Sequence, residues 1–211
     1  MSLNESSFNN KSIGLIVLAA GESNRLGKPK QLIRFRGKAL LQHVLDESSK
    51  LQVSPKVLVL GAHSAAIQNE INADGYEVLK NENWREGMGS SLHAAMEHVL
   101  RSNQSLGGIL ILVSDQPFVS TELLQDMIHS FSGGSDIIAC QYKDNLGVPA
   151  LFGQDYCDEL LKITGDRGAK SVIRKFSDRV KPITFEEGIL DIDTKEDIAY
   201  LEKIEQDGRN S

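Results

Sequence analysis

The chain has 211 residues, of which 40% are hydrophobic and 25% are charged, so it is long enough to bury a full core and we expect one domain. Its formal net charge of −6 and its isoelectric point near 5.4 argue against a nucleic-acid-binding protein, because such proteins usually carry a basic surface. Cations that gather in one segment of so acidic a chain therefore indicate a local site for an anion.

Cysteine usage and hydropathy indicate the cellular compartment. Cys140 and Cys157 form no C-x-x-C pair, and two cysteines in a chain of this size are typical of reduced thiols without a cysteine metal site. The apolar run at residues 13–20 is far shorter than the roughly 20 residues that span a bilayer, and the polar segment before it has no signal-peptide pattern. We expect a cytoplasmic protein that binds neither membrane nor nucleic acid, with one domain at residues 12–206 between disordered tails at 1–11 and 207–211.

The first predicted element is a buried strand that leads into a cationic loop. Residues 13–17 form a continuous apolar run typical of a buried strand. The loop at residues 18–30 contains small residues and three cations, Arg25, Lys28 and Lys30. Small residues let backbone N–H groups approach an anion, and a guanidinium suits bidentate contact with phosphate. The loop therefore predicts a phosphate site, and the alternative is an ordinary glycine-rich turn on a basic surface.

This loop departs from the two better-known phosphate loops. Five residues separate Gly21 from Gly27, where a P-loop has four, and Pro29 stands where a P-loop has a metal-binding hydroxyl. The G-x-G-x-x-G pattern of dinucleotide-binding proteins is absent from the sequence.

Strands and helices then alternate along the chain. The pattern predicts, in order, a helix at 40–51, a strand at 56–60, a helix at 64–71, a strand at 76–79, a helix at 90–101, a strand at 108–113, and a helix at 121–131 capped by Ser120 or Thr121. Such alternation indicates an α/β fold with three layers, in which a doubly wound, mostly parallel sheet binds ligands at the carboxyl ends of its strands.

After residue 135 the alternation loosens. We expect strands at 136–141 and 148–152 and helices near 155–162 and 167–176. We interpret this part as a lobe that builds one side of a cleft before a last strand and helix return to the main sheet.

Asp115 comes directly after the apolar strand. A carboxylate at the end of a central strand is costly to bury unless a positive group meets it, and a hydrated Mg²⁺ that carries phosphate oxygens is a suitable partner. Gln116 and Pro117 then turn the chain away from the sheet. The alternative is a strand-end aspartate that begins a turn.

A second pair of carboxylates, Asp191 and Asp193, would point the same way in an extended segment, and the pattern leaves open which of them reaches the metal. Thr194 and Asp197 have the spacing of a capping box for the last helix, which is compatible with the metal site.

Two further segments combine glycine with polar groups at predicted helix starts. In residues 81–92, Gly87 permits close backbone approach, and Ser90 and Ser91 offer hydroxyls and free N–H groups, although Ser90 is equally a plain N-cap. Trp84 in the same segment is more consistent with packing than with stacking on a base. In the Gly-Asp-Arg-Gly segment, Arg167 suits a second anion site or a surface ion pair.

These motifs occur in one order: L-A-A-G-x-S-x-R-x-G-x-x-K at 18–30, D-Q-P at 115–117, G-D-R-G at 165–168 and D-I-D-T at 191–194. Together they resemble the molybdenum cofactor cytidylyltransferases, which are related to the molybdenum cofactor guanylyltransferases. The resemblance covers about residues 13–201. Ala20 is similar to the cytidylyltransferase branch, since the guanylyltransferase branch usually carries glycine there, and Leu26 stands where methionine is usual.

The resemblance implies a Rossmann-like nucleotide-diphospho-sugar transferase fold and a Mg²⁺-dependent nucleotidyltransferase. The reaction would move CMP from CTP, or the nucleotidyl group of another NTP, to molybdopterin with release of pyrophosphate, and a molybdenum hydroxylase would receive the product. Two other functions stay open: a sugar- or alcohol-phosphate nucleotidyltransferase, and a non-catalytic carrier or accessory protein for the molybdenum cofactor.

The motifs and the resemblance assign roles to individual residues. The expected catalytic residues are Arg25, Lys30 and Asp115, and the expected Mg²⁺ ligands are Asp115, Asp191 and Asp193. The expected nucleotide-binding residues are Leu18, Ala19, Ala20, Gly21, Gly27, Lys30, Gly87, Ser90 and Ser91. The expected acceptor-binding residues are Gly147, Pro149, Gly165, Asp166 and Arg167.

Overall fold

A computed structural model describes residues 12–23, 26–102, 105–189, 192 and 194–209. Its main sheet has seven strands in the order β5-β4-β1-β6-β8-β7-β9. The strands are β1 (Ser12–Ala19), β4 (Lys56–Leu60), β5 (Glu77–Lys80), β6 (Leu106–Val113), β7 (Ile137–Tyr142), β8 (Asn145–Gly153) and β9 (Val180–Thr184). All neighbours pair in parallel except β8, which runs antiparallel to β6 and β7, so the expected mostly parallel sheet is confirmed.

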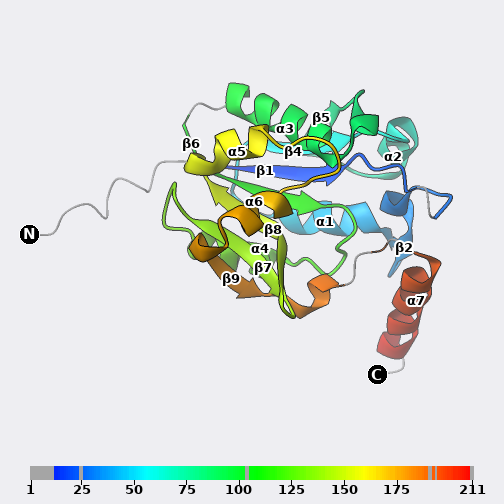
Figure 1. Cartoon of the computed structure of the whole chain (residues 1–211). Helices are drawn as coiled ribbons and strands as arrows, with labels where there is room; N and C mark the ends of the chain where they lie inside the picture. The colour runs from blue at the N-terminus through cyan, green and yellow to red at the C-terminus, as the bar shows by residue number, and fades with distance from the viewer. Residues whose placement is uncertain (1–11, 24–25, 103–104, 190–191, 193, 210–211) are drawn as a thin grey trace, which may run out of the picture.

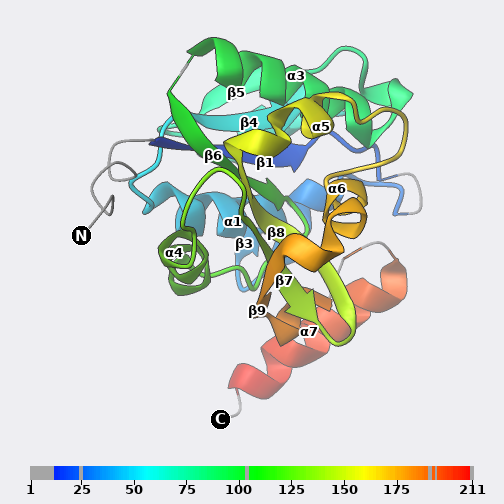
Figure 2. The ribbon, with the colours of Figure 1, turned by 60° about the vertical axis from the view of Figure 1, so that its left-hand side comes forward.

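Helices cover both faces of this sheet, which makes three layers (Figures 1 and 2). One face packs against α3 (Met88–Ser102), α5 (Cys157–Leu161) and α6 (Lys170–Lys175). The opposite face packs against α1 (Leu40–Ser49), α2 (Ser64–Glu70) and α4 (Thr121–His129). Because the central strands are buried on both sides, their sequences are continuous apolar runs, and these runs marked them in the sequence.

The local signals at two helix starts are also confirmed. The hydroxyl of Ser120 accepts a hydrogen bond from the backbone N–H of Leu123 at 3.2 Å, so Ser120 caps α4. At α7 (Lys195–Arg209), the N–H of Asp197 donates to Oγ1 of Thr194 at 3.2 Å, and the N–H of Thr194 donates to Asp197 Oδ2 at 2.8 Å. This reciprocal pair is the capping box that the spacing predicts.

The expectation of a separate lobe after residue 135 is wrong for the strands. β8 pairs directly with β6, with Leu151 opposite Leu110, and β7 lies on its other side. The fully buried stretch Ala150, Leu151 and Phe152 gives β8 enough apolar surface to extend the main sheet. Of this part of the chain, α5, α6 and their connecting segments lie over one face of the sheet (Figure 2).

A short hairpin escaped the sequence analysis. Strands β2 (Arg34–Phe35) and β3 (Lys38–Ala39) pair around Arg36 and Gly37, whose φ angles of 48° and 79° are those of a type I′ turn. Two-residue strands leave too few positions for an alternating pattern to show in the sequence.

The C-terminal helix packs against this hairpin. Leu201 of α7 lies in a small core with Phe35 and Leu40, away from the helix layers of the main sheet (Figure 1). The expected return to the main sheet is therefore correct for β9, which pairs with β7, and wrong for α7. The helix continues to Arg209, beyond residue 206 where the domain was expected to end. In the described part of the chain, every helix is too short or too polar to cross a lipid bilayer.

Candidate active site

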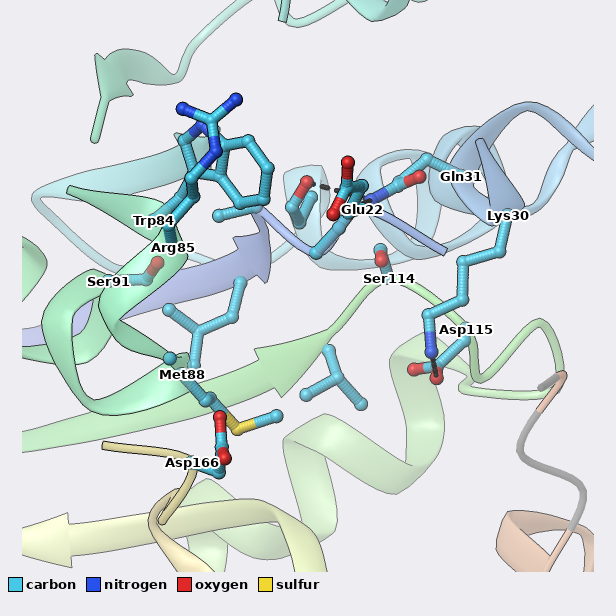
Figure 3. A pocket seen from close by; sticks show the side chains of 16 residues that line it. Glu22, Lys30, Gln31, Trp84, Arg85, Met88, Ser91, Ser114, Asp115 and Asp166 are labelled. Atoms are coloured by element: carbon cyan, nitrogen blue, oxygen red, sulfur yellow. Dashed lines mark hydrogen bonds and ion pairs between the residues drawn. The ribbon is translucent and has the colours of Figure 1, made fainter. Parts of the chain in front are cut away.

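A cavity of about 650 Å³ opens at the carboxyl ends of β1 and β6 (Figure 3). Ligands bind at this edge of open α/β sheets, where the strand order changes direction. Here β4 and β5 extend the sheet on one side of β1, and the chain then crosses to β6 on the other side. The cavity is lined by nine residues of the sequence prediction, namely Leu18, Ala19, Ala20, Gly21, Lys30, Gly87, Ser91, Asp115 and Asp166.

Lys30 and Asp115 meet in this cavity. The ammonium nitrogen of Lys30 lies 2.5 Å from Oδ2 of Asp115, and their side chains are 19% and 10% exposed. The hydroxyl of Ser23 accepts a hydrogen bond from the backbone N–H of Lys30 at 3.0 Å, which anchors the start of the 3-10 helix η1 (Lys30–Leu32). The sequence analysis expected a metal ion as the positive partner of Asp115, whereas the described partner is the ammonium of Lys30.

Gln31 shapes the phosphate loop, and the sequence analysis gave it no role. Its side chain is fully buried, and Nε2 donates hydrogen bonds to the carbonyls of Ala19 at 2.9 Å and Gly21 at 3.0 Å. The carbonyl between them, that of Ala20, accepts from the N–H of Ala62 at 3.1 Å. Three successive peptide groups of the loop are therefore held in place.

A second unforeseen residue, Asn81, organises the polar loop before α3. It is buried, and Nδ2 donates to the hydroxyls of Ser90 and Ser91 at 2.9 Å each. The Ser90 hydroxyl donates in turn to the carbonyl of Gly87 at 2.9 Å. Ser91 lines the cavity, whereas Ser90 lies beside a separate hollow. The alternative that Ser90 is a plain N-cap is wrong, because α3 already begins at Met88 and the Ser90 hydroxyl donates to a carbonyl instead of capping a helix N–H.

Gly87 and Gly89 of this loop allow close contact with the segment at Thr164 and Gly165. A Cβ on Gly87 would lie 2.4 Å from the carbonyl of Gly165, and a Cβ on Gly89 would lie 2.7 Å from Cα of Thr164. The N–H of Gly89 donates to the carbonyl of Gly165 at 2.8 Å. The sequence analysis expected close backbone approach here, and the structure shows that the approaching group is the Gly165 loop.

Trp84 packs against the core, as the sequence analysis favours over stacking on a base. It lies half-buried against the core under α3, and a Cβ on Gly61 would stand only 2.7 Å from Cβ of Trp84. The guanidinium of Arg85 stacks 4.4 Å from the centre of the Trp84 ring. Figure 3 shows both side chains at the end of the cavity opposite Lys30 and Asp115.

The expected acceptor residues are spread over several places. Asp166 lines the main cavity. Arg167 faces a second hollow of about 420 Å³ and donates to Oγ1 of Thr164 at 3.2 Å. Gly165 lines a third hollow beside Asn81.

Gly147, Pro149 and Gly27 lie outside the lining of the main cavity. A Cβ on Gly147 would lie less than 2.5 Å from the hydroxyl of Tyr142, so this glycine makes room for the tyrosine. Gly27 has a φ of 64° and is exposed in the phosphate loop, where its conformation, rather than contact with the cavity, requires glycine.

Arg25, Asp191 and Asp193 lie outside the described residues. Within the residues described, no group of three His, Cys, Asp or Glu side chains has the arrangement of a metal site. Mg²⁺ usually takes only one or two protein carboxylates and completes its shell with water and phosphate oxygens. Asp115, which opens into the cavity, therefore fits a role as one such ligand.

Both cysteines are free thiols. Burial raises the pKa of the Cys140 thiol to about 12, and burial together with Asp158 and Asp155 raises that of Cys157 to about 11. Neither thiol is placed or activated for chemistry in the cavity.

The family model of the MobA-like NTP transferase domain matches residues 15–180. A probable molybdenum cofactor guanylyltransferase of Pyrococcus horikoshii is 28% identical over 88% of this chain and 96% of that protein. The nicotine blue oxidoreductase of Paenarthrobacter nicotinovorans is 28% identical over 76% of this chain and 80% of that protein.

The similarity extends to solved structures. Rv0371c of Mycobacterium tuberculosis has a TM-score of 0.79 at 30% identity, over 92% of this chain and 98% of that one. A complex of Rv0371c with manganese has a TM-score of 0.73 at 28% identity, over 90% of this chain and 98% of that one. The expected fold is thereby confirmed.

Proposed function

The chain belongs to the MobA-like NTP transferase family, and from that premise we propose that it transfers CMP from CTP to a molybdopterin acceptor and releases pyrophosphate. The observation that carries this proposal is the meeting of Lys30 and Asp115 in one cavity at the strand ends. A triphosphate needs a cationic side chain and, through a divalent metal, a carboxylate. The name of the Pyrococcus relative supports a molybdenum cofactor precursor as the acceptor.

The proposed reaction requires that the two substrates be positioned and that the negative charge of the triphosphate be neutralised. A phosphate of the acceptor is already ionised and attacks the α-phosphorus in line, and the new P–O bond forms as the bond to the pyrophosphate oxygen breaks. No general base is needed for this step. Lys30 donates hydrogen bonds to the triphosphate and stabilises the charge that develops on the leaving pyrophosphate. Arg25, by its place in the sequence motif, shares this role.

The residues present fit a divalent metal at the phosphate end. Asp115 would hold the ion together with Asp191 or Asp193, and the manganese complex of the Mycobacterium neighbour supports a divalent cation in this family. We propose Mg²⁺, which would neutralise negative charge on the phosphates while these carboxylates hold it.

The rest of the cavity divides between the two substrates. Leu18, Ala19, Ala20, Gly21, Gly87 and Ser91 form the proposed nucleotide wall, with Gly27 and Ser90 supporting its loops. Asp166 marks the side that receives the acceptor, which Gly147, Pro149, Gly165 and Arg167 would extend beyond the cavity. A molybdenum hydroxylase is the proposed recipient of the product.

We propose that the side chain of Ala20 determines the preference for CTP over GTP. Its Cβ lies so close to Gly61 that a Cβ on that glycine would stand 2.9 Å away, so the alanine methyl has a fixed place beside the cavity. That methyl narrows the space for the base relative to glycine and favours the smaller pyrimidine. The name of the Pyrococcus relative supports GTP as the competing substrate.

The test is pyrophosphate release with molybdopterin and Mg²⁺, in which CTP, GTP and ATP are compared for the wild type and for Ala20→Gly. We expect turnover with CTP above GTP in the wild type and a lower CTP/GTP ratio in the variant. An unchanged ratio contradicts the role of Ala20. Turnover only with a simple sugar phosphate supports the sugar-phosphate nucleotidyltransferase instead, and nucleotide binding without any pyrophosphate release supports the carrier.

A further inference from the structure

Two buried glutamines lie close to the cavity: Gln31 in η1 lines it, and Gln116 directly follows the lining residue Asp115. Gln31 and Gln116 are 0% and 2% exposed. Each donates hydrogen bonds from Nε2 to backbone carbonyls of a neighbouring segment, and in each the buried Oε1 has no hydrogen-bond partner within the described residues. An unpartnered buried oxygen is costly, and a methionine of similar length would fill the same space without it. We therefore infer that each amide acts through the backbone carbonyls to which its Nε2 donates hydrogen bonds.

Gln31 fixes the direction of the N–H groups in the phosphate loop. A peptide group is planar and trans, so its N–H points opposite to its carbonyl. Nε2 of Gln31 holds the carbonyls of Ala19 and Gly21, which orients the N–H groups of Ala20 and Glu22. The bond from Ala62 to the carbonyl of Ala20 orients the N–H of Gly21 in the same way. Three consecutive N–H groups with fixed directions are what an anion-binding nest requires.

Gln116 ties the segment that carries Asp115 to β8, which lies beyond the lining of the cavity. It follows Asp115 at the end of β6, and its Nε2 donates to the carbonyl of Val148 at 3.0 Å. Val148 stands in β8 between Gly147 and Pro149, the two residues that the sequence assigns to the acceptor. The register between β7 and β8 is irregular at this point, so the regular ladder alone does not fix the segment.

We propose that Gln31 is a positioning residue for the nucleotide and Gln116 is a positioning residue for the acceptor. The proposal rests on the proposed function and assigns each amide to one substrate. Loss of the Gln31 amide frees the loop N–H groups that meet the triphosphate, and loss of the Gln116 amide frees the β8 segment that meets the acceptor. Neither residue touches the reacting atoms in this account.

The experiment compares Gln31→Met with Gln116→Met, each of which serves as the control for the other. In steady-state assays, Gln31→Met is expected to raise the KM for CTP about tenfold and to leave the KM for molybdopterin within about twofold, and Gln116→Met is expected to do the reverse. Calorimetric titration with CTP and Mg²⁺, without acceptor, gives a second readout: the dissociation constant rises for Gln31→Met and stays unchanged for Gln116→Met.

Three results would overturn the proposal. In the first, the wild type turns over normally, but each variant changes the KM values for both CTP and molybdopterin, or changes neither. This result leaves the proposed function intact and removes the assignment of one glutamine to each substrate. The second is failure of both the methionine variant and a leucine variant at the same position to fold, because the amide would then be needed by the fold itself. The third is absence of turnover by the wild type with every nucleotide and acceptor, which removes the proposed function and this inference together.

Discussion

The ion pair between Lys30 and Asp115 stands where a triphosphate and a divalent cation would bind. The two groups are 2.5 Å apart and largely shielded from solvent, so their attraction is less screened than that of a surface pair. A divalent ion at Asp115 would meet the ammonium charge at close range, and like charges repel. We therefore expect Lys30 to weaken metal binding until a triphosphate draws its ammonium away.

This coupling gives a prediction at the scale of single residues. Lys30→Met should raise the affinity of the nucleotide-free protein for Mn²⁺ by about tenfold, because the competing charge is removed. Electron paramagnetic resonance of free Mn²⁺ during titration measures this affinity. Lys28→Met is the matched control, since Lys28 is an exposed cation of the same loop. Equal affinities in the wild type and Lys30→Met, or an equal rise in both variants, would show that Lys30 does not compete with the metal.

Some residues of the site follow from the sequence and others do not. Lys30 and Asp115 could be placed in one site in advance, because each comes after one of two buried strands whose carboxyl ends lie at the same edge of the sheet, but their direct ion pair was not predicted. The roles of Gln31 and Asn81 could not be predicted, because their partners are backbone carbonyls and serine hydroxyls that only the folded loops bring within hydrogen-bond distance. A polar residue within a loop carries no periodic signal of its burial.

Among the structural elements, the contact between α3 and the loop before α6 joins the two walls of the cavity. Gly87 has a φ of 99°, and the carbonyl of Gly165 occupies the space where its Cβ would be. The N-terminus of α3 and the loop with Asp166 therefore form one continuous surface in the cavity. We expect the proposed nucleotide and acceptor walls to depend on this contact for their relative placement.

Gly87→Ala tests this contact against Gly75→Ala. Both glycines have a positive φ, 99° and 82°, but a Cβ on Gly75 would meet nothing within 4 Å. We expect Gly75→Ala to lower the free energy of unfolding by about 1–2 kcal/mol through backbone strain. Gly87→Ala should lower the free energy of unfolding by about 1–3 kcal/mol more than Gly75→Ala does, because the new methyl also forces the two loops apart. Urea unfolding measures both values, and equal losses would mean that the two loops do not depend on close contact at Gly87.

The sequence predicted long elements better than short or irregular ones. β4 has the expected bounds, and strands β1, β5, β6, β7 and β8 and helices α1 to α4 lie within a few residues of theirs, because apolar periodicity records which faces are buried. The hairpin of β2 and β3 was missed, since its strands have two residues each. The insertion of β8 between β6 and β7 was also missed, because strand order is set by pairing in space and not by position in the chain.

At the scale of the whole molecule, strand order places the site. The chain builds β1, β4 and β5 in one direction and then crosses to β6 on the other side of β1, which leaves the cavity at the change of direction. The acidic net charge of −6 contrasts with the cations of the first loop, so we expect this loop to attract an anionic ligand.

The most direct measurement is a crystal structure of the protein with CTP and Mg²⁺. We expect the triphosphate to lie in the cavity between the loop of residues 20–22 and Lys30, with the metal ion on Asp115 and the base toward Ala20 and Ser91. The same crystals of Asp115→Asn should lose the metal while the loop keeps its shape. Nucleotide bound at another surface, or metal bound away from Asp115 in the wild-type protein, would contradict the account.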